Sequence, residues 1–297
     1  MKRMNIGVIG LGIMGSPIAG HLLAAGHSVQ GYDIDAVARE TASLLGVAST
    51  GTLREIIANS EVLLTSLPNA KALGSVLDVI EGLPRGASSP AVVIELSTFA
   101  LAEKLAVRQR LEFANVAMLD CPISGTGAQA RVADLTLYAS GEENIFKRYQ
   151  SLLADFSRDP RYVGIFGNGS KMKLVANLLV AIHNVATAEA MAMAIKAGLN
   201  AEQAIQALAS GAGGSRIFSL RAPLMAAARY TPATMKLEVW DKDMQLIDDY
   251  ARELGLDLPL FSSSRPLYRE ATRRNPLADT AAVFEILVDG SGPATAS

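Results

Sequence analysis

Short apolar runs alternate with helical patterns through the first half of the chain. The apolar runs predict strands at 5–10, 28–33, 61–66, 91–96, 115–119, 134–139 and 161–166. The helical patterns lie between most of them, at 15–25, 35–44, 52–58, 69–79, 100–111 and 142–156. Such alternation is typical of right-handed crossover connections between parallel strands. It predicts an α/β fold with a mainly parallel sheet, whose ligands lie at the carboxyl ends of the strands.

After about residue 166 the pattern becomes helical throughout. Helices are predicted at 169–197, 201–209, 216–228, 234–254, 260–273 and 279–288. The first would be about 40 Å long at about 1.5 Å per residue. It is apolar on most faces, so we expect it to be buried, with Val175 and Leu179 in the core. Asn177 and Asn184 interrupt its apolar run and argue against a membrane span.

The most informative segment runs from residue 5 to residue 35. An apolar run ends in a glycine-rich turn, a helical pattern follows, and a second apolar run closes the unit. This order is the dinucleotide-binding fingerprint. Its turn residues are Gly10, Leu11, Gly12, Ile13, Met14 and Gly15. We expect the first glycine to permit the tight turn, the second to let the backbone approach a pyrophosphate, and the third to let the helix pack close to the strand.

Asp33 follows this turn by about twenty residues, where a carboxylate accepts the ribose hydroxyls of NAD and repels the 2′-phosphate of NADP. No arginine directly follows it, and the nearest is Arg39. We therefore predict NAD as the cofactor, with NADP as the alternative, bound by a Rossmann-type domain over 1–166. An all-helical substrate and oligomerisation domain, joined by the long helix, is expected over 167–289. A disordered tail is expected over 290–297.

Composition narrows the classes of partner. Half of the 297 residues are hydrophobic, and 27 Lys and Arg are interspersed with 29 Asp and Glu, for a net charge of −2. No basic stripe indicates a nucleic acid or an anionic membrane as partner. Cys121 is the single cysteine and the three histidines share no ligand spacing, so neither a disulfide nor a metal site is expected. The first strand begins almost at residue 1, which predicts a cytoplasmic protein without a signal peptide.

Three segments carry candidate chemistry. Ser124, Gly125 and Thr126 follow a strand, where a hydroxyl and backbone N–H groups could form a small nest for a carboxylate. A turn that only reverses the chain accounts for the same residues. Another segment, in a later helix, is Trp240, Asp241, Lys242, Asp243 and Met244. It could bring its lysine towards the cofactor or substrate, or form a solvated helix face.

Lys173 and Asn177 are four residues apart and share one face of the long helix, for which Ser170 is the expected N-cap. A lysine in the first turn of an apolar helix opposes the helix dipole and loses water. Both effects lower the pKa of Lys173 towards the range useful for proton transfer. The alternative is a surface lysine whose stem lies on apolar surface, beside a satisfied core amide.

Together these motifs resemble the β-hydroxyacid dehydrogenases, the family of 3-hydroxyisobutyrate dehydrogenase and tartronate semialdehyde reductase. Four motifs occur in the family's order and cover nearly the whole chain. They are Gly10-x-Gly12-x-Met14-Gly15, Asp120-Cys-Pro-Ile-Ser124-Gly125, Gly167-x-Gly169-xxx-Lys173-xxx-Asn177 and Lys242-Asp243-Met244. The chain departs from the family at Cys121, where Ala is common, and at Thr126, where Gly is common. Both departures touch the substrate pocket and leave the identity of the acid open.

The resemblance implies roles for individual residues. Lys173 would be the general acid/base and Asn177 a substrate-orienting amide. The substrate carboxylate would be held by Ser124, Gly125 and Thr126. The cofactor side would hold Leu67, Pro68, Ser97, Thr98 and Lys242, the last also at the substrate. The implied activity is hydride transfer between NAD and a small β-hydroxy acid or its semialdehyde, of the 3-hydroxyisobutyrate or glycerate type, with a 6-phosphogluconate dehydrogenase-like C-terminal domain.

Other functions fit the same fold. One is a sugar-acid dehydrogenase of the threonate or 6-phosphogluconate type, and another is an imine reductase. Imine reductases of this build usually lack the lysine, so Lys173 counts against that activity. A non-catalytic dinucleotide-binding protein would not need Lys173, Asn177 and Ser124 together. The apolar long helix predicts a homodimer or homotetramer.

Overall fold

The computed structural model describes residues 3–49, 51–83 and 90–289. The chain divides into two compact units, Met1–Lys173 and Leu174–Ser297. The N-terminal unit has two hydrophobic cores and the C-terminal unit has one. The tail predicted to be disordered, 290–297, lies outside the described residues.

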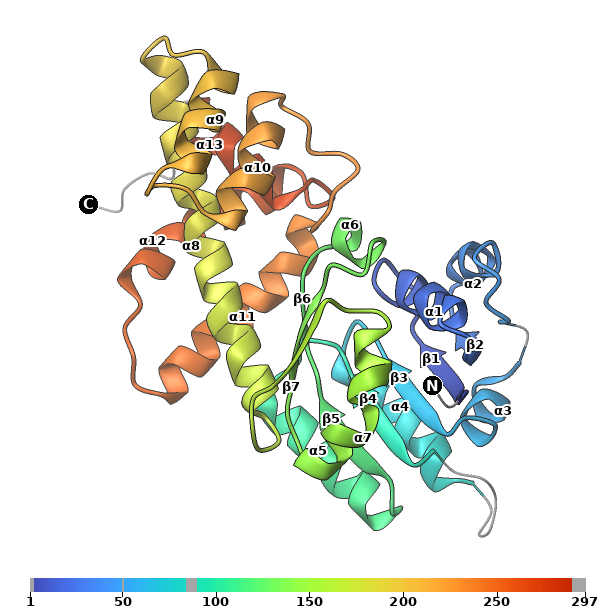
Figure 1. The fold of residues 1–297 in the computed structure, drawn as a ribbon. Helices are drawn as coiled ribbons and strands as arrows, with labels where there is room; N and C mark the ends of the chain where they lie inside the picture. Colours follow the sequence, from blue (N-terminus) through green and yellow to red (C-terminus); the bar gives the residue numbers. More distant parts are fainter. Residues whose placement is uncertain (1–2, 50, 84–89, 290–297) are drawn as a thin grey trace. The chain divides into compact units, whose positions relative to one another are not determined.

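A five-stranded parallel sheet organises the N-terminal unit (Figure 1). Its strands are β1 (Asn5–Ile9), β2 (Ser28–Tyr32), β3 (Val62–Thr65), β4 (Val92–Glu95) and β5 (Ala117–Asp120). They run in the order β2-β1-β3-β4-β5, with every pairing parallel. The chain turns back at β1 to continue through β3, and this reversal is the point at which doubly wound sheets bind ligands. The predicted parallel sheet is confirmed.

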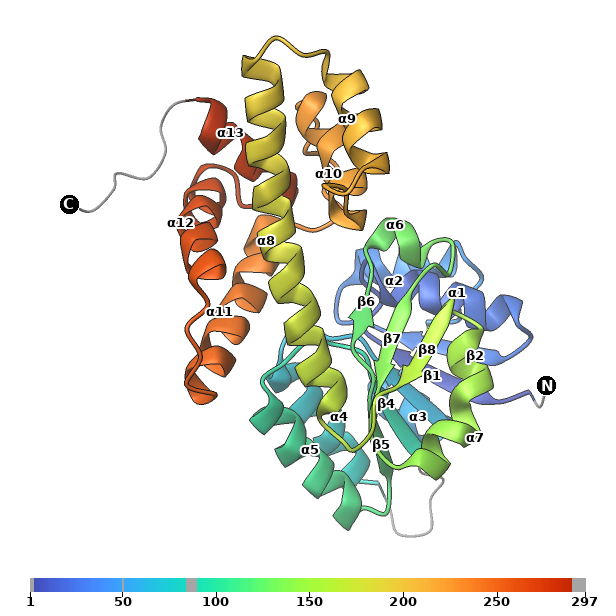
Figure 2. The same ribbon diagram turned by 60° about the vertical axis from the view of Figure 1, so that its left-hand side comes forward.

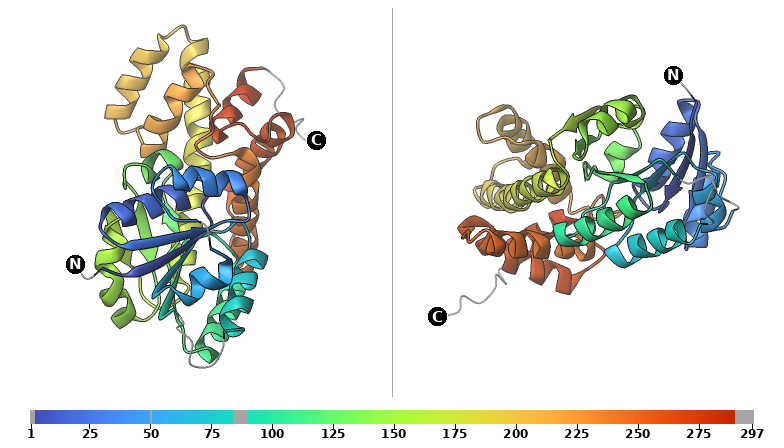
Figure 3. Two further views of the ribbon diagram at one scale, coloured as in Figure 1. Left: turned by 90° about the vertical axis from the view of Figure 1, so that its right-hand side faces the viewer. Right: turned by 90° about the horizontal axis from the view of Figure 1, so that it is seen from below.

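Helices cover both faces of this sheet (Figure 3). They are α1 (Gly15–Ala24), α2 (Ala36–Ser43), α3 (Leu53–Ala58), α4 (Ala70–Glu81), α5 (Leu101–Phe113) and α7 (Glu143–Ala154). Side chains of α1, α2 and α7 form one core, and those of α3, α4 and α5 form another. Leu64 and Ile94 enter the first core, whereas the adjacent Leu63 and Val93 enter the second. Both strand faces are buried, which explains their continuous apolar runs.

A second, three-stranded sheet follows and is only partly predicted by the sequence. It contains β6 (Ile123–Ser124), β7 (Thr136–Ala139) and β8 (Asp159–Tyr162), with β6 antiparallel to β7 and the short helix α6 (Gly127–Ala130) between them. The strand expected at 161–166 was misplaced. Positive φ at Gly164 (+99°) and Gly167 (+94°) turns the chain there.

The C-terminal unit is helical, as predicted. Its helices are α8 (Asn168–Lys196), which begins in the N-terminal unit, α9 (Ala201–Ser210), α10 (Arg216–Ala226), α11 (Leu237–Glu253), α12 (Pro259–Arg274), the 3₁₀ turn η1 (Thr280–Ala282) and α13 (Val283–Val288). They pack along α8 (Figure 2). One stripe of α8, from Leu174 through Ala181 to Met191, lies in the core.

The expectation that α8 is buried on most faces was wrong. Val175 is 51% exposed and Leu179 is 50% exposed. Among the described residues, α8 is the one helix whose length and mean hydropathy of 1.6 suit a membrane span. Its inward stripe packs into the core of the helical unit and carries the buried amides Asn177 and Asn184, as in a core helix.

Candidate active site

The glycine turn after β1 has the geometry that a dinucleotide needs. Gly10 has a φ of +94°, and a Cβ placed there would lie 2.1 Å from the carbonyl oxygen of Ser66. A Cβ on Gly15 would lie 1.8 Å from the carbonyl oxygen of Gly10, so α1 packs against the turn only with glycine there. A Cβ on Gly12 would meet nothing within 4 Å. The backbone at Gly12 therefore faces open space, where a phosphate can approach it.

The start of α1 adds to this phosphate site. Gly12 and Ile13 are exposed beside it. Among the side chains that the structure describes, none caps the helix at Met14. The first N–H groups of a helix and its positive dipole end attract phosphate. The turn and the helix start therefore fit the pyrophosphate of a dinucleotide.

Asp33 lies just beyond the end of β2 and faces the same turn. Its Oδ2 accepts a hydrogen bond from the Leu11 N–H at 2.7 Å, and its Oδ1 accepts one from the Asp35 N–H at 2.9 Å. Asp33 is half-buried, and Arg39 Nη1 donates to its carbonyl oxygen at 2.6 Å. The carboxylate is thus fixed beside the phosphate turn, where it suits ribose hydroxyls. Arg39 lies closer to Asp33 than its sequence distance suggested.

A groove of about 790 Å³ lies beside the same turn, between α1 and α2. It is lined by Leu11, Gly12 and Ile13, and by exposed apolar residues of α2 and its C-terminal end such as Val37 and Leu44. Asp33, which suits the ribose, is not among its lining residues. The groove therefore shares Gly12 and Ile13 with the phosphate turn.

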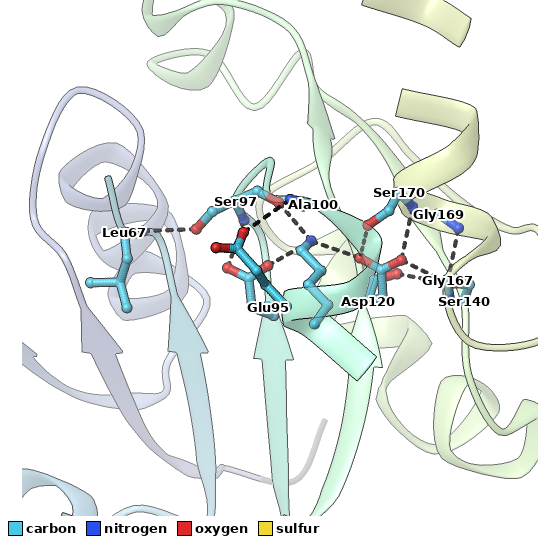
Figure 4. A network of polar contacts seen from close by, with 11 residues as sticks. Leu67, Glu95, Ser97, Ala100, Asp120, Ser140, Gly167, Gly169 and Ser170 are labelled. Carbon is cyan, nitrogen blue, oxygen red and sulfur yellow. Dashed lines mark hydrogen bonds and ion pairs between the residues drawn. The ribbon is translucent and has the colours of Figure 1, made fainter. Parts of the chain in front are cut away.

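The loops after β3 and β4 meet at the carboxyl edge of the sheet. The Leu67 N–H donates to Ser97 Oγ at 2.8 Å, which joins the two loops (Figure 4). Leu67, Ser97 and Thr98 are half-buried and Pro68 is exposed. These residues occupy the ends of the two strands that follow β1 in the sheet, next to the phosphate turn. That position fits the cofactor side of the site.

Ser124, Gly125 and Thr126 end the short strand β6 and are half-buried. Gly125 has a φ of +147°, and Thr126 starts α6. The expectation that this turn leaves its backbone N–H groups free is wrong at Thr126. Its N–H donates to Gln129 Oε1 at 3.0 Å in a capping box. The Thr126 N–H is therefore already bonded within the turn.

A buried charge cluster, which the sequence analysis missed, lies under the site loops. Glu95 ends β4, Asp120 ends β5, and the two are register partners in the sheet. Lys104 Nζ of α5 lies 2.6 Å from Glu95 Oε2 and 2.8 Å from Asp120 Oδ1, and all three side chains are fully buried (Figure 4). Burial alone would lower the pKa of Lys104, but the two carboxylates outweigh it and raise that pKa above its ordinary value.

The sequence holds two signals for this cluster. Both carboxylates follow apolar runs that pair as neighbouring strands. Lys104 lies in the first turn of a helical pattern, where a cation opposes the helix dipole. Neither signal says that the three side chains meet, because that depends on how the strands pair.

Asp120 also holds the start of α8. Its Oδ2 accepts the Ser170 N–H at 2.8 Å and its Oδ1 accepts the Ser170 hydroxyl at 2.9 Å (Figure 4). The expectation that Ser170 is the N-cap is wrong, since α8 begins at Asn168 and Ser170 lies inside its first turn. An acid from another element accepts the Ser170 N–H instead.

Lys173 follows in the next turn of α8 and is buried, with 8% of its surface exposed. Asn177, one turn further on in the C-terminal unit, is 3% exposed. The two residues share one face of the helix, as their spacing predicted. Burial excludes the alternative of a surface lysine.

Asn177 is held by the fourth motif of the sequence. Its Nδ2 donates to Asp243 Oδ2 at 2.9 Å, and Lys242 Nζ lies 3.3 Å from Asp243 Oδ1. The Lys242 side chain is 39% exposed, whereas Asp243 is buried. The alternative of a wholly solvated helix face is therefore wrong. Trp240 is 3% exposed and packs in the core of the helical unit, so it fills the core.

Cys121 is fully buried in the core of the N-terminal unit. Burial, and next the charge of Asp120, raise the pKa of its thiol well above the ordinary value. A neutral buried thiol is a packing residue and a poor nucleophile. Across the described ranges, no three His, Cys, Asp or Glu residues are grouped to hold a metal ion.

The fold and the glycine turn define a nicotinamide-dinucleotide-dependent oxidoreductase, and comparison with known proteins identifies its family. Residues 5–167 match the NAD binding domain of 6-phosphogluconate dehydrogenase. Residues 167–287 match the NAD-binding domain family of NADP-dependent 3-hydroxyisobutyrate dehydrogenase. The chain belongs to the β-hydroxyacid dehydrogenase family and is an enzyme that acts on CH–OH groups.

Individual relatives match along nearly the whole chain. L-threonate dehydrogenase of Cupriavidus necator is 30% identical over 95% of each chain. 2-Hydroxy-3-oxopropionate reductase of Escherichia coli is 29% identical over 89% of this chain and 90% of that protein. The crystal structure of 3-hydroxyisobutyrate dehydrogenase from Salmonella typhimurium superposes with a TM-score of 0.84 at 29% identity, covering 95% of this chain and 99% of that one. The resemblance inferred from the motifs is confirmed.

Proposed function

We propose that this enzyme oxidises a small hydroxy acid, or reduces the corresponding semialdehyde, with Lys173 as the general acid/base. The observation that carries the proposal is the burial of Lys173 in the first turns of α8, on the same helix face as Asn177. General acid–base catalysis of this kind contributes about 10²- to 10⁴-fold to a rate.

The residues of this chain perform the proton half of the reaction. In the oxidative direction Lys173 Nζ accepts the hydroxyl proton of the substrate, and in reduction it returns that proton. The bound nicotinamide supplies the hydride acceptor. Asp243 Oδ2 accepts a hydrogen bond from Asn177 Nδ2 and so orients the amide. The amide then presents one fixed orientation to a substrate. Fixed orientation lowers the barrier because less freedom is lost on reaction.

Ser124 is the proposed anchor for the substrate carboxylate, with Gly125 and Thr126 shaping the turn around it. Ser124 is half-buried at the end of β6, and its hydroxyl can donate one hydrogen bond to a carboxylate oxygen. The 3-hydroxyisobutyrate or glycerate type of substrate fits this anchor. The names of the relatives also support threonate as a second candidate, because the C. necator protein is an L-threonate dehydrogenase.

The cofactor, assembly and location of the enzyme complete the proposal. Asp33 supports NAD over NADP, since its carboxylate lies beside the phosphate turn.

The apolar residues Val175 and Leu179, half-exposed along α8, support a homodimer or homotetramer. Light scattering on purified protein measures that state directly. A cytoplasmic location, with neither nucleic acid nor membrane as partner, follows from the balanced charge and the single cysteine.

A substrate panel followed at the NADH absorbance tests the proposed function. The panel contains 3-hydroxyisobutyrate, glycerate, threonate, serine and 4-hydroxybutyrate. It also contains 6-phosphogluconate and a cyclic imine as substrates of the alternative functions. We expect turnover with at least one small hydroxy acid, and loss of that turnover in Ser124→Ala through a raised KM. Turnover of the imine or of 6-phosphogluconate alone contradicts the proposal.

A further inference from the structure

The cluster of Glu95, Lys104 and Asp120 lies under the site, but its groups are already bonded within the protein. The Lys104 ammonium has three donors, and three oxygens lie within 2.8 Å of it, those of Glu95, Asp120 and the Ser97 carbonyl. The Lys104 side chain is also fully buried, so a substrate does not reach it. It is not a catalytic residue.

The Asp120 carboxylate accepts four hydrogen bonds. Its Oδ1 accepts from Lys104 and from the Ser170 hydroxyl, and its Oδ2 accepts from the Ser170 N–H and the Ser140 hydroxyl. A carboxylate has about four acceptor positions, so all are used. Ser140 extends the network, because its Oγ also accepts the N–H groups of Gly167 and Gly169 at 3.2 and 2.9 Å.

The two ends of this network are the two sides of the proposed site. At one end, Glu95 Oε1 accepts the Ser97 N–H at 2.9 Å, Lys104 holds the Ser97 carbonyl, and Ser97 Oγ holds the Leu67 N–H. At the other end, Asp120 and Ser140 hold the first turn of α8, one turn before Lys173. Figure 4 shows the chain of contacts from Leu67 to Ser170.

The charges of the cluster fit this connecting position. Two carboxylates and one ammonium carry a formal charge of −1, and they lie at the N-terminal end of a 29-residue helix. The positive dipole end of α8 compensates that charge. Lys104 itself lies in the first turn of α5, where its charge is unfavourable without the two acids.

We propose that Glu95, Lys104 and Asp120 are positioning residues that lock the Ser97 loop to the first turn of α8. The inference rests on the proposed function, in which the Ser97 loop is the cofactor side and α8 carries the acid/base. The network fixes the cofactor side and Lys173 in one register, although none of its three charged members touches the reacting atoms. A misplacement of about 1 Å between such groups costs about 10²-fold in rate.

The double variant Lys104→Met/Glu95→Gln tests the proposal. It leaves the cluster with the same formal charge of −1 and similar volume, and the introduced amide keeps an acceptor for the Ser97 N–H, but the link to Asp120 is lost. We expect kcat to fall about 10- to 100-fold, while the Kd for NADH, measured by fluorescence, changes by less than the fall in kcat. A folded double variant with wild-type kcat overturns the proposal.

A matched control separates positioning from stability. Arg221 and Asp279 form a second buried ion pair, at 2.6 Å, in the C-terminal unit and outside the site segments. In Arg221→Met/Asp279→Asn we expect wild-type kcat and KM, whatever the change in stability. A similar fall in kcat in both double variants would mean that any buried pair has this effect, and it would also overturn the proposal.

A milder substitution serves if the double variant does not fold. Ser170→Ala removes the hydroxyl that donates to Asp120 Oδ1 but keeps the backbone N–H bond. We expect kcat to fall about three- to tenfold, the equivalent of one hydrogen bond, and Ser170→Thr to restore it. Unchanged kcat in Ser170→Ala contradicts the proposal.

Amide hydrogen exchange distinguishes this inference from the proposed function. In Lys104→Met/Glu95→Gln, or in Ser170→Ala if the former does not fold, we expect faster exchange both at 97–101 and at 168–172. If the wild-type enzyme turned over no hydroxy acid, the proposed function would fail, yet exchange would still decide whether the two segments are locked together. Faster exchange in the altered segment alone refutes the lock.

Discussion

The two units of this protein bury charge in different ways. In the N-terminal unit, Lys104 pairs with Glu95 and Asp120 at the carboxyl edge of the sheet, and the bonds of that cluster end on loops that carry candidate site residues. In the C-terminal unit, Arg221 pairs with Asp279, whose other oxygen accepts the N–H and hydroxyl of Thr234. The second pair ties helices and turns of one core together.

The difference separates a positioning role from a packing role. Both clusters consist of buried, hydrogen-bonded ions, so burial and charge alone do not tell them apart. What differs is the segments they join. Asp120 holds the turn of α8 that precedes Lys173, whereas Asp279 holds the loop before α11. A buried ion pair therefore indicates function only through the segments at its ends.

The largest loss of stability is expected from variants that remove one acid from each buried cluster. Asp120→Ala leaves Lys104 with one carboxylate and uncaps α8, and Asp279→Ala leaves Arg221 buried without its acid. Each should lower the free energy of unfolding by about 3–5 kcal/mol. Guanidinium titration measures that loss. Of the two, only Asp120→Ala should also lower kcat per folded molecule. Equal kcat values in both variants would contradict the distinction between a positioning role and a packing role.

Two glycines of the phosphate turn sharpen the comparison within one loop. Gly15→Ala places a Cβ against the carbonyl oxygen of Gly10 and should destabilise the N-terminal unit by about 1–3 kcal/mol. Gly12→Ala meets no atom, so the melting temperature should stay near that of wild type while the Kd for NADH rises at least about tenfold. Thermal melts and NADH titration measure both. A Gly12→Ala variant that binds NADH normally places the phosphate elsewhere.

A smaller effect is expected on the preference of the enzyme for NAD over NADP. Asp33→Ser removes the carboxylate that suits the ribose hydroxyls, and Arg39 already lies against the Asp33 carbonyl. We expect kcat/KM for NAD to fall about tenfold, the equivalent of a hydrogen bond to a charged group, and kcat/KM for NADP to rise. Initial rates with both cofactors decide it. Unchanged preference would refute the role of Asp33.

The smallest expected effect is on the pH dependence of stability. The Lys104 cluster should lose its contribution at high pH, and the Asp279 pair should lose its contribution at low pH. The folded pKa of Lys104 is raised, so its contribution is present below the ordinary value of 10.5 and is lost as pH rises through the folded pKa. The pKa of Asp279 is lowered because Arg221 and its hydrogen bonds outweigh burial. Its contribution is present above 3.8 and is lost as pH falls.

Unfolding titrations across pH test this opposition. Compared with wild type, Arg221→Met/Asp279→Asn should lose the part of the acid sensitivity that comes from Asp279 but keep its alkaline sensitivity. Lys104→Met/Glu95→Gln should keep the acid sensitivity from Asp279 and lose the part of the alkaline sensitivity that comes from Lys104. The same pH profile in both variants would contradict the assignment of the two shifts.

The fold was largely predictable because its strands are buried on both faces. Runs such as 62–65 and 92–95 are apolar at every position or nearly so, and glycines and polar residues separate them. The short strand β6 has two residues and carries no such signal. Positions 163–166 look like a strand, but the positive φ at Gly164 ends it. Periodicity reports burial and does not report register or chain reversal.

The candidate site was predictable only in part. The motifs predicted Lys173, Asn177 and Asp33 as site residues because each stands at a fixed distance from a helix or strand end, and their roles stay predictions. The bonds between Lys104, Glu95 and Asp120 depend on pairing between distant strands, which no local pattern encodes. Likewise, apolar residues such as Val175 do not say whether they face the core of their own chain or its surface.

The central claim is that Lys173 carries the proton of the reaction, and Lys173→Ala tests it most directly. With the best substrate of the panel, we expect kcat to fall about 10²- to 10⁴-fold while the Kd for NADH stays close to wild type. Added ethylamine should restore part of the rate, because a free amine can replace the lost one. A variant that retains near-wild-type kcat would contradict the account.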